Sequence, residues 1–166
     1  IEGRNADPNV FVQMDTYAVK GLQPGQIQFL YAPTHLNPTY EYGVTFERGT
    51  AVTYGDRKQI FISGTASIDN QGEIMYPGDI LKQTERMLEN IDTLLQEAGS
   101  GLQDIMQAIV YLRDPADYVV VKQYIESRYP SFLHLIVHAP VCRPGWLIET
   151  ECIAVIPADA PQYAYL

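Results

Sequence analysis

An amphipathic helix over residues 80–98 is the sequence feature that most constrains the fold of this chain. Its apolar side chains recur every three or four positions, and so form a stripe along one helix face. Asp79 is expected to cap the start of the helix, and Gly99 to follow its last turn. Such a helix is stable when it covers an apolar surface, which the flanking segments must supply. The stripe consists of Ile80, Leu81, Met87, Leu88, Ile91, Leu94, Leu95 and Ala98.

The segments on both sides of this helix have the short apolar runs of β-strands. A second helix is expected to begin at Asp114-Pro115 and to stop before Pro130. The resulting order, β-β-α-β-α-β-β, predicts an α+β domain whose two helices cover one face of a mixed sheet. The expected strands are residues 44–53, 59–67, 104–112, 132–138 and 146–156, the first two forming a hairpin.

The last expected strand carries large apolar side chains on both of its faces. Two helices can cover only one face of the sheet, so the other cover must come from another copy of the chain or from its N-terminal segment. We therefore expect a closed oligomer. The side expected to face the helices holds Trp146, Ile148, Thr150, Cys152 and Ala154, and Cys152 is interpreted there as a packing residue. The other side holds Leu147, Glu149, Glu151, Ile153 and Val155.

The chain is expected to divide into an N-terminal arm at residues 1–43, a domain at 44–157 and a tail at 158–166. The arm has several prolines and no sustained periodicity, but too many aromatic residues for a free tail. It either packs on this domain or a neighbouring subunit, or links to a missing N-terminal domain. Residues 1–4 read IEGR, which is also the sequence of a commonly engineered protease cleavage site. We interpret them either as a preparation remnant or as part of a longer protein.

Length and charge exclude several functional classes. With 166 residues the chain suits one domain with a real core, and its net charge of −9 disfavours nucleic-acid binding, which needs a basic surface. No apolar run is long enough to span a membrane. The chain has 2 cysteines, too few for a disulfide framework, so reduced thiols in the cytoplasm are the default expectation.

Four blocks of sequence point to a known family. They are residues 62–66 (ISGTA), a helix ending in residues 97–99 (EAG), residues 109–114 (IVYLRD) and residues 148–155 (IETECIAV). Over about residues 44–157 the chain resembles the RidA/YjgF superfamily, formerly labelled endoribonuclease L-PSP. The resemblance implies a chorismate-mutase-like fold of the bacillus type, assembled as a homotrimer with ligand clefts between adjacent subunits.

The resemblance also implies an activity. Deaminating members hydrolyse enamines and imines, and pair a glutamate in the last strand with an arginine that holds the substrate carboxylate. Glu149 matches the glutamate, whereas His134 stands at the position of the arginine. A neutral imidazole cannot hold a carboxylate with two parallel hydrogen bonds. The alternative to an enzyme is therefore a metabolite-binding or regulatory trimer without catalysis.

A second resemblance concerns residues 139–144 (APVCRP) followed by Glu149, together with residues 46–48 (FER). These resemble the C-terminal half of chorismatases, which share the fold and hydrolyse the enol ether of chorismate. There a glutamate donates the proton and arginines hold carboxylates. The chain would represent only such a half, consistent with a missing N-terminal domain.

Glu149 is also a candidate catalytic acid on physical grounds. It lies between Leu147 and Ile153 on one strand face, and partial burial would raise its pKa and keep it protonated near neutrality. Glu151 on the same face would raise the pKa further. The alternative is a pair of carboxylates that face solvent.

The other candidate residues are expected to bind substrate. Arg143 and Arg48 are the candidate carboxylate ligands, the alternative being surface ion pairs. Cys142 is interpreted as cleft lining, although a nucleophile with His134 or His138 as base is the alternative. The resemblance to the family implies two further roles. Lys122 roughly matches a polar ligand-contacting position of the family on the second helix, and Ser63, Gly64, Thr65 and Ala66 match positions whose backbone N–H groups bind an oxyanion. The alternative is that Gly64 is only a β-bulge residue.

No cofactor or metal is expected, because neither zinc-ligand spacing nor a phosphate-binding loop is present. The sequence thus predicts a RidA-like enzyme at a trimer interface. Its glutamate acts as general acid or base on a carboxylate-bearing enamine, imine or chorismate-like enol ether.

Overall fold

The computed structural model describes residues 6–165, and its longest helix is α1 (Ile80–Glu97). Asp79 caps the helix as expected, its side chain accepting a hydrogen bond from the Lys82 backbone N–H at 3.1 Å. Gly99 follows the helix with a φ of +79°, and the Ser100 N–H bonds back to the Leu95 carbonyl at 3.0 Å. The positive φ explains why a glycine ends this helix.

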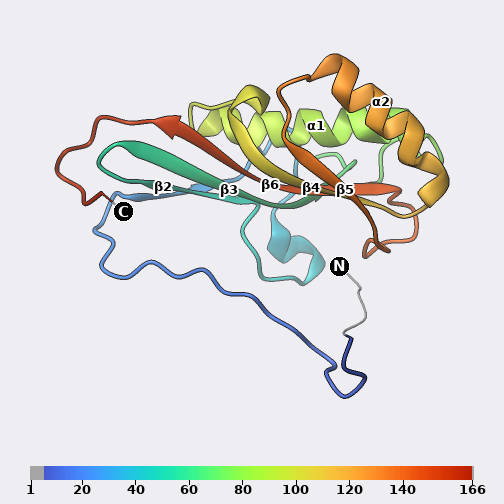
Figure 1. Ribbon diagram of the computed structural model, residues 1–166, viewed down its shortest axis with the longest axis horizontal. Helices are drawn as coiled ribbons and strands as arrows, with labels where there is room; N and C mark the ends of the chain where they lie inside the picture. The colour runs from blue at the N-terminus through green and yellow to red at the C-terminus, as the bar shows by residue number, and fades with distance from the viewer. Residues whose placement is uncertain (1–5, 166) are drawn as a thin grey trace.

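A mixed sheet of six strands lies against the helices, in the order β1-β2-β3-β6-β4-β5 (Figure 1). Only β4 and β5 are parallel; the other neighbours are antiparallel. The helix α2 (Tyr118–Arg128), preceded by the 3-10 turn η3 (Pro115–Asp117), connects these two parallel strands. The strands are β1 (Ile27–Leu30), β2 (Gly49–Thr53), β3 (Arg57–Ala66), β4 (Ile105–Leu112), β5 (His134–His138) and β6 (Ile148–Pro157).

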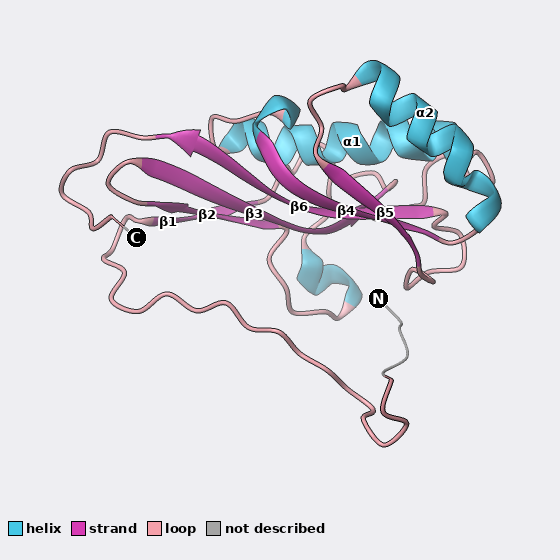
Figure 2. Ribbon diagram, in the orientation of Figure 1, coloured by secondary structure: helices cyan, strands magenta, loops and turns pink. Residues whose placement is uncertain are grey.

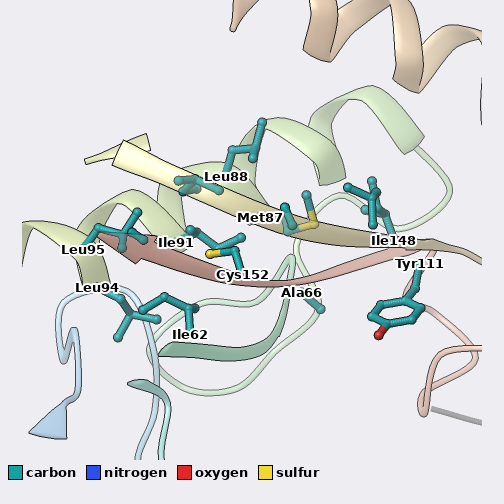
Figure 3. Packing of buried hydrophobic residues seen from close by; sticks show 14 of the residues in the cluster. Ile62, Ala66, Met87, Leu88, Ile91, Leu94, Leu95, Tyr111, Ile148 and Cys152 are labelled. Carbon is teal, nitrogen blue, oxygen red and sulfur yellow. The ribbon is translucent and has the colours of Figure 1, made fainter. Parts of the chain in front are cut away.

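Both helices lie on one face of the sheet, which confirms the predicted α+β class (Figure 2). The core fills the space between α1 and the sheet, where Met87, Ile91 and Leu94 are fully buried (Figure 3). Cys152 points from β6 into this core and is 4 % exposed, so the prediction that it is a packing residue is confirmed.

Four segments differ clearly from the sequence-based expectation. Residues 27–30, assigned to the arm, form β1 and pair with β2, where Leu30 opposes Gly49. The expected strand at 44–53 begins only at Gly49, because residues 44–48 leave the sheet and bring Arg48 against Asn37. Likewise β6 begins at Ile148, because the chain turns just before it: the Trp146 N–H bonds to the Arg143 carbonyl. A short 3-10 helix, η1 (Thr39–Tyr42), was not predicted.

Residues 6–25 run as an extended segment on the side of the sheet away from the helices (Figure 1). Tyr17 contacts the sheet, with its ring centroid 5.7 Å from that of Phe61. Phe11 and Met14 are exposed by 94 % and 81 %. Whether the arm packs on the domain or a neighbouring subunit, or links to a further domain, remains a prediction. Residues 1–4, interpreted as a preparation remnant or as part of a longer protein, lie outside the described residues.

The sheet face opposite the helices carries half-buried apolar side chains, including Phe61, Ile109 and Ile153. They border a hollow of about 230 Å³ over β3, β4 and β6. Across residues 6–165, neither helix has the length and apolarity that crossing a membrane requires.

Candidate functional site

Glu149 lies near the start of the central strand β6, between Ala66 of β3 and Tyr111 of β4. Although it is a carboxylic acid, it is only 8 % exposed. Its Oε2 atom has no hydrogen-bond partner within the described residues. Burial raises the pKa of Glu149, and the nearby Glu151 carboxylate raises it further. The predicted burial is confirmed, and the arrangement favours a protonated acid that can donate to a bound molecule.

A glycine makes room for this carboxyl group. The register of β3 against β6 shifts between Ile62 and Thr65, so Gly64 lies in a β-bulge, as one of the two interpretations predicted. A Cβ atom on Gly64 would overlap Oε1 of Glu149. The Gly64 backbone and the carboxyl group of Glu149 are therefore in direct contact, which only glycine permits.

Glu149 lines a cavity of about 600 Å³. Its volume lies in the range of pockets that hold small organic ligands. The walls come from β3, β6, the loop before β2 and the loop before β6. They are Val44, Phe46, Arg48, Ser63, Gly64, Ala66, Ile68, Cys142, Arg143, Trp146, Glu149 and Glu151.

The two arginines of this cavity differ in their surroundings. Arg48 is 5 % exposed and donates from Nη2 to the Asn37 carbonyl and to Asn37 Oδ1, both at 2.9 Å. Its guanidinium also lies 5.2 Å from the Phe46 ring centroid. Arg143 is exposed and stacks over Trp146 at 5.4 Å. Arg48 is thus fixed in the wall, whereas Arg143 lies at the surface of the cavity, where it can meet an incoming anion.

Seven of the predicted site residues come together here: Glu149, Arg143, Arg48, Cys142, Ser63, Gly64 and Ala66. The remaining three do not line this cavity. Thr65 is buried, with its hydroxyl donating to the Ser63 carbonyl at 2.9 Å. Lys122 pairs with Glu126 on α2 at 3.1 Å, in the helical layer. His134 is opposite Ala108 on β4, three residues, or roughly 10 Å, along that strand from the partner of Glu149.

Phe46 and Trp146 belong to the site but were not predicted as site residues. Trp146 was expected to point toward the helices as part of a longer β6. Both positions adjoin predicted residues, Phe46 in the motif with Arg48 and Trp146 after Arg143. Tyr111 was also missed; its hydroxyl donates to Glu151 Oε1 at 2.9 Å, which fixes that carboxylate beside Glu149. Pairing of the predicted strand at 104–112 with the strand that carries Glu149 could have indicated Tyr111, because Tyr111 lies directly opposite Glu149.

Histidine, cysteine and carboxylate side chains do not gather in groups of three that could hold a metal ion anywhere in residues 6–165. Cys142 is a free, exposed thiol in the cavity wall. Nδ1 of His134, one of its two candidate bases, lies 2.8 Å from the Phe132 carbonyl oxygen.

A mixed six-stranded sheet with two α-helices on one face defines a class of small α+β domains. Within that class, residues 49–156 match the family model described as Endoribonuclease L-PSP, so the chain belongs to this family, the RidA/YjgF superfamily.

Relatives with this domain are recognisable in sequence. A RutC family protein of Pyrococcus abyssi is 35 % identical over 97 residues, which are 57 % of this chain and 76 % of the relative. The 3-aminoacrylate deaminase RutC of Acinetobacter baylyi is 30 % identical over 97 residues, 57 % of this chain and 77 % of the relative.

Solved structures share the fold at lower sequence identity. RidA from Psychrobacter sp. PAMC 21119 has a TM-score of 0.64 and 23 % identity, and covers 78 % of this chain and 99 % of its own. TdcF of E. coli with bound serine has a TM-score of 0.63 and 21 % identity, and covers 78 % and 98 %. These likenesses confirm the predicted fold.

Proposed function

We propose that the chain is a hydrolase for carboxylate-bearing enamines, imines or enol ethers, with Glu149 as the proton donor. The observation that carries the proposal is the buried Glu149 carboxyl, whose raised pKa and unpartnered Oε2 face a ligand-sized cavity. General-acid catalysis needs a protonated group, and a raised pKa keeps the proton on a carboxyl group to higher pH. Similarity to the 3-aminoacrylate deaminase RutC of Acinetobacter baylyi supports enamine chemistry.

The reaction on an enamine proceeds in two steps. Glu149 donates its proton to the β-carbon of the C=C–N unit, which leaves a carbon–nitrogen iminium. Water then adds to the iminium carbon, Glu149 takes back a proton, and the C–N bond breaks to release ammonia and a ketoacid. An enol ether follows the same course, except that the bond from carbon to the ether oxygen breaks and an alcohol leaves.

Arg143 is the residue we assign to the substrate carboxylate. Members with deaminase activity use an arginine where this chain has His134, and His134 does not line the cavity that contains Glu149. Arg143 does line it, and a guanidinium can hold a carboxylate with two parallel hydrogen bonds. The relocated arginine also agrees with the likeness of residues 139–144 to chorismatases, which makes an enol ether a substrate to test beside enamines.

A homotrimer is part of this proposal. The half-buried apolar side chains on the sheet face without helices, among them Ile109 and Ile153, support contact with further copies of the chain. Neighbouring copies would then complete the wall of the cavity around Glu149.

The test supplies the purified protein with freshly generated 2-aminoacrylate and, in a separate assay, with chorismate. Glu149→Gln should lower the rate by about 100-fold or more, since loss of a general acid costs about 10² to 10⁴ in rate. Glu126→Gln, on the outer surface of α2, is the matched control and should keep the wild-type rate. Turnover by wild type that Glu149→Gln leaves unchanged would contradict the proposal.

A second candidate is a metabolite-binding trimer without catalysis, favoured by His134 at the family's arginine position. In that case neither substrate is turned over, and His134→Arg creates deaminase activity or tighter carboxylate binding. If His134→Arg changes neither, loss of the arginine is not what silenced the site.

A further inference from the structure

A second cavity, of about 460 Å³, lies beside the one that contains Glu149. The two share Phe46 and Arg48 as lining residues. Residues 31–48 run from the end of β1 through η1 to the start of β2 (Figure 2). They form the walls of this second cavity, which we call the side lobe. Its lining residues are Tyr31, Pro33, Leu36, Asn37, Pro38, Thr39, Tyr40, Phe46, Glu47 and Arg48.

The side lobe is chemically unlike the cavity beside it. Aromatic, proline and leucine side chains make up most of its wall, and two tyrosines, Tyr31 and Tyr40, are 57 % and 78 % exposed. Exposed aromatic side chains gathered around a hollow are typical of ligand sites, because flat rings stack on them. The lining thus suits a planar or cyclic apolar group.

The side lobe is also held in place by hydrogen bonds to the rest of the domain. The backbone N–H groups of Tyr31 and Ala32 donate to the two carboxylate oxygens of Glu97, at 2.8 and 2.9 Å. The backbone and side-chain oxygens of Asn37 accept hydrogen bonds from the guanidinium of Arg48. The hydroxyl of Thr39 donates to the Phe46 carbonyl at 3.0 Å. A site that is ordered before binding loses less entropy when a ligand enters it.

The match to the family model begins at residue 49 and does not include the segment that builds this lobe. A three-carbon enamine fills only a small fraction of the cavity of about 600 Å³ that contains Glu149. The unfilled volume and the adjoining side lobe favour a substrate that extends beyond the reacting carbons.

We propose that the side lobe binds a six-membered ring carried by the substrate, so that this chain prefers ring-bearing carboxylates to three-carbon ones. The proposal rests on the proposed function for the site itself. The reacting C=C or C=N group meets Glu149, the carboxylate meets Arg143, and the ring passes Phe46 to lie between Tyr31 and Tyr40. Tyr31 and Tyr40 are then specificity-determining residues, not catalytic ones.

The first experiment measures binding, so that its result does not depend on turnover. Phenylpyruvate and pyruvate, which share the ketoacid group and differ in the ring, are titrated into the protein by isothermal titration calorimetry. We expect wild type to bind phenylpyruvate at least about tenfold more tightly. In the double variant Tyr31→Ala/Tyr40→Ala the two ketoacids should bind with affinities that differ by less than about twofold. The affinity for pyruvate should stay unchanged.

The control is Tyr118→Ala, which removes another exposed tyrosine, 43 % accessible, from α2 and should keep the wild-type ratio of the two affinities. Both lobe tyrosines are exposed, so the double variant should fold, which circular dichroism checks. Equal binding of the two ketoacids by wild type, or a preference that survives the double substitution, would overturn the proposal.

The second experiment separates this proposal from the proposed function. Imines are generated from phenylalanine and from alanine by an amino-acid oxidase, and their hydrolysis is compared. Preferential binding of phenylpyruvate without hydrolysis of either imine overturns the catalytic function and keeps the side lobe. Equal hydrolysis of both imines together with equal binding of the two ketoacids overturns the side-lobe proposal and keeps the catalytic function.

Discussion

Gly64 and Glu149 depend on each other, because the carboxyl group occupies the space where any other residue at position 64 would place its Cβ atom. Gly64→Ala should therefore displace the carboxyl group and lower kcat about 10- to 100-fold, the cost of a misplacement near 1 Å. Kinetics on 2-aminoacrylate or chorismate measure this effect. Gly101→Ala is the control, since its new Cβ meets only the end of the flexible Gln103 side chain; full activity in Gly64→Ala would contradict the role given to this contact.

The raised pKa of Glu149 makes stability depend on pH in a defined direction. In the unfolded chain this carboxyl group loses its proton near its ordinary pKa, whereas in the folded protein it keeps the proton to higher pH. Between these two pKa values the folded state binds more protons, so the free energy of unfolding falls as pH rises through that window. Below both pKa values the group is protonated in both states. The free energy of unfolding then no longer changes with pH through Glu149, and the stabilisation is fully present.

Urea denaturation of wild type and Glu149→Gln between pH 4 and pH 8 tests this direction, because glutamine cannot titrate. We expect the stability of wild type to fall relative to the variant as pH rises, and its activity to fall over the same range as the acid deprotonates. A difference between the two proteins that stays constant with pH would show that Glu149 titrates normally.

Among single residues, Glu149 was assigned to the site from the family resemblance. Alternation along the strand placed Glu149 and Cys152 on opposite faces. Phe46 and Trp146 could not be assigned in this way. They lie in irregular segments next to a strand, where side-chain direction depends on tertiary contacts such as that of Arg48 with Asn37.

Elements with strong local signals were predicted well. The helix α1 has a cap, an apolar stripe and a terminating glycine, which all indicate the same residues. The short strand β1 has no such signal: three of its four residues are exposed, and it is defined by pairing with β2. Pairing between segments far apart in sequence is invisible to a local pattern, so this edge strand was taken for part of the arm.

Glu97 at the end of α1 connects the helix to the segment that follows β1. Glu97→Ala removes the acceptor of two backbone N–H groups and should lower the free energy of unfolding by about 1–2 kcal/mol. Urea denaturation measures the loss. Glu126→Ala removes only a surface ion pair on α2 and should cost less than about 0.5 kcal/mol; equal losses in the two variants would mean that Glu97 adds nothing to the fold beyond a surface charge.

In the whole molecule, as far as residues 6–165 describe it, both α-helices lie on one face of the sheet (Figure 2). The apolar residues on both faces of β6 had indicated that the other face needs a different cover. What covers that face cannot be derived from the pattern, because another copy of the chain and the N-terminal arm would satisfy it equally. Tyr17 of the arm reaches Phe61 at one side of the sheet. Ile109 and Ile153 lie on the two strands next to each other, β4 and β6, and are the positions we assign to contact between copies.

Ile153→Arg places a charge in the middle of this face and tests whether copies of the chain cover it. In a trimer the guanidinium would be buried without a partner, so the variant should sediment as a monomer in analytical ultracentrifugation while its circular dichroism stays unchanged. Activity should fall at least about 100-fold if neighbouring copies complete the cavity around Glu149. Val119→Arg, on the exposed side of α2, is the matched control and should leave both assembly and activity unchanged. An Ile153→Arg variant that sediments like wild type, or a wild type that is itself monomeric, would show that the open face is not an interface between copies.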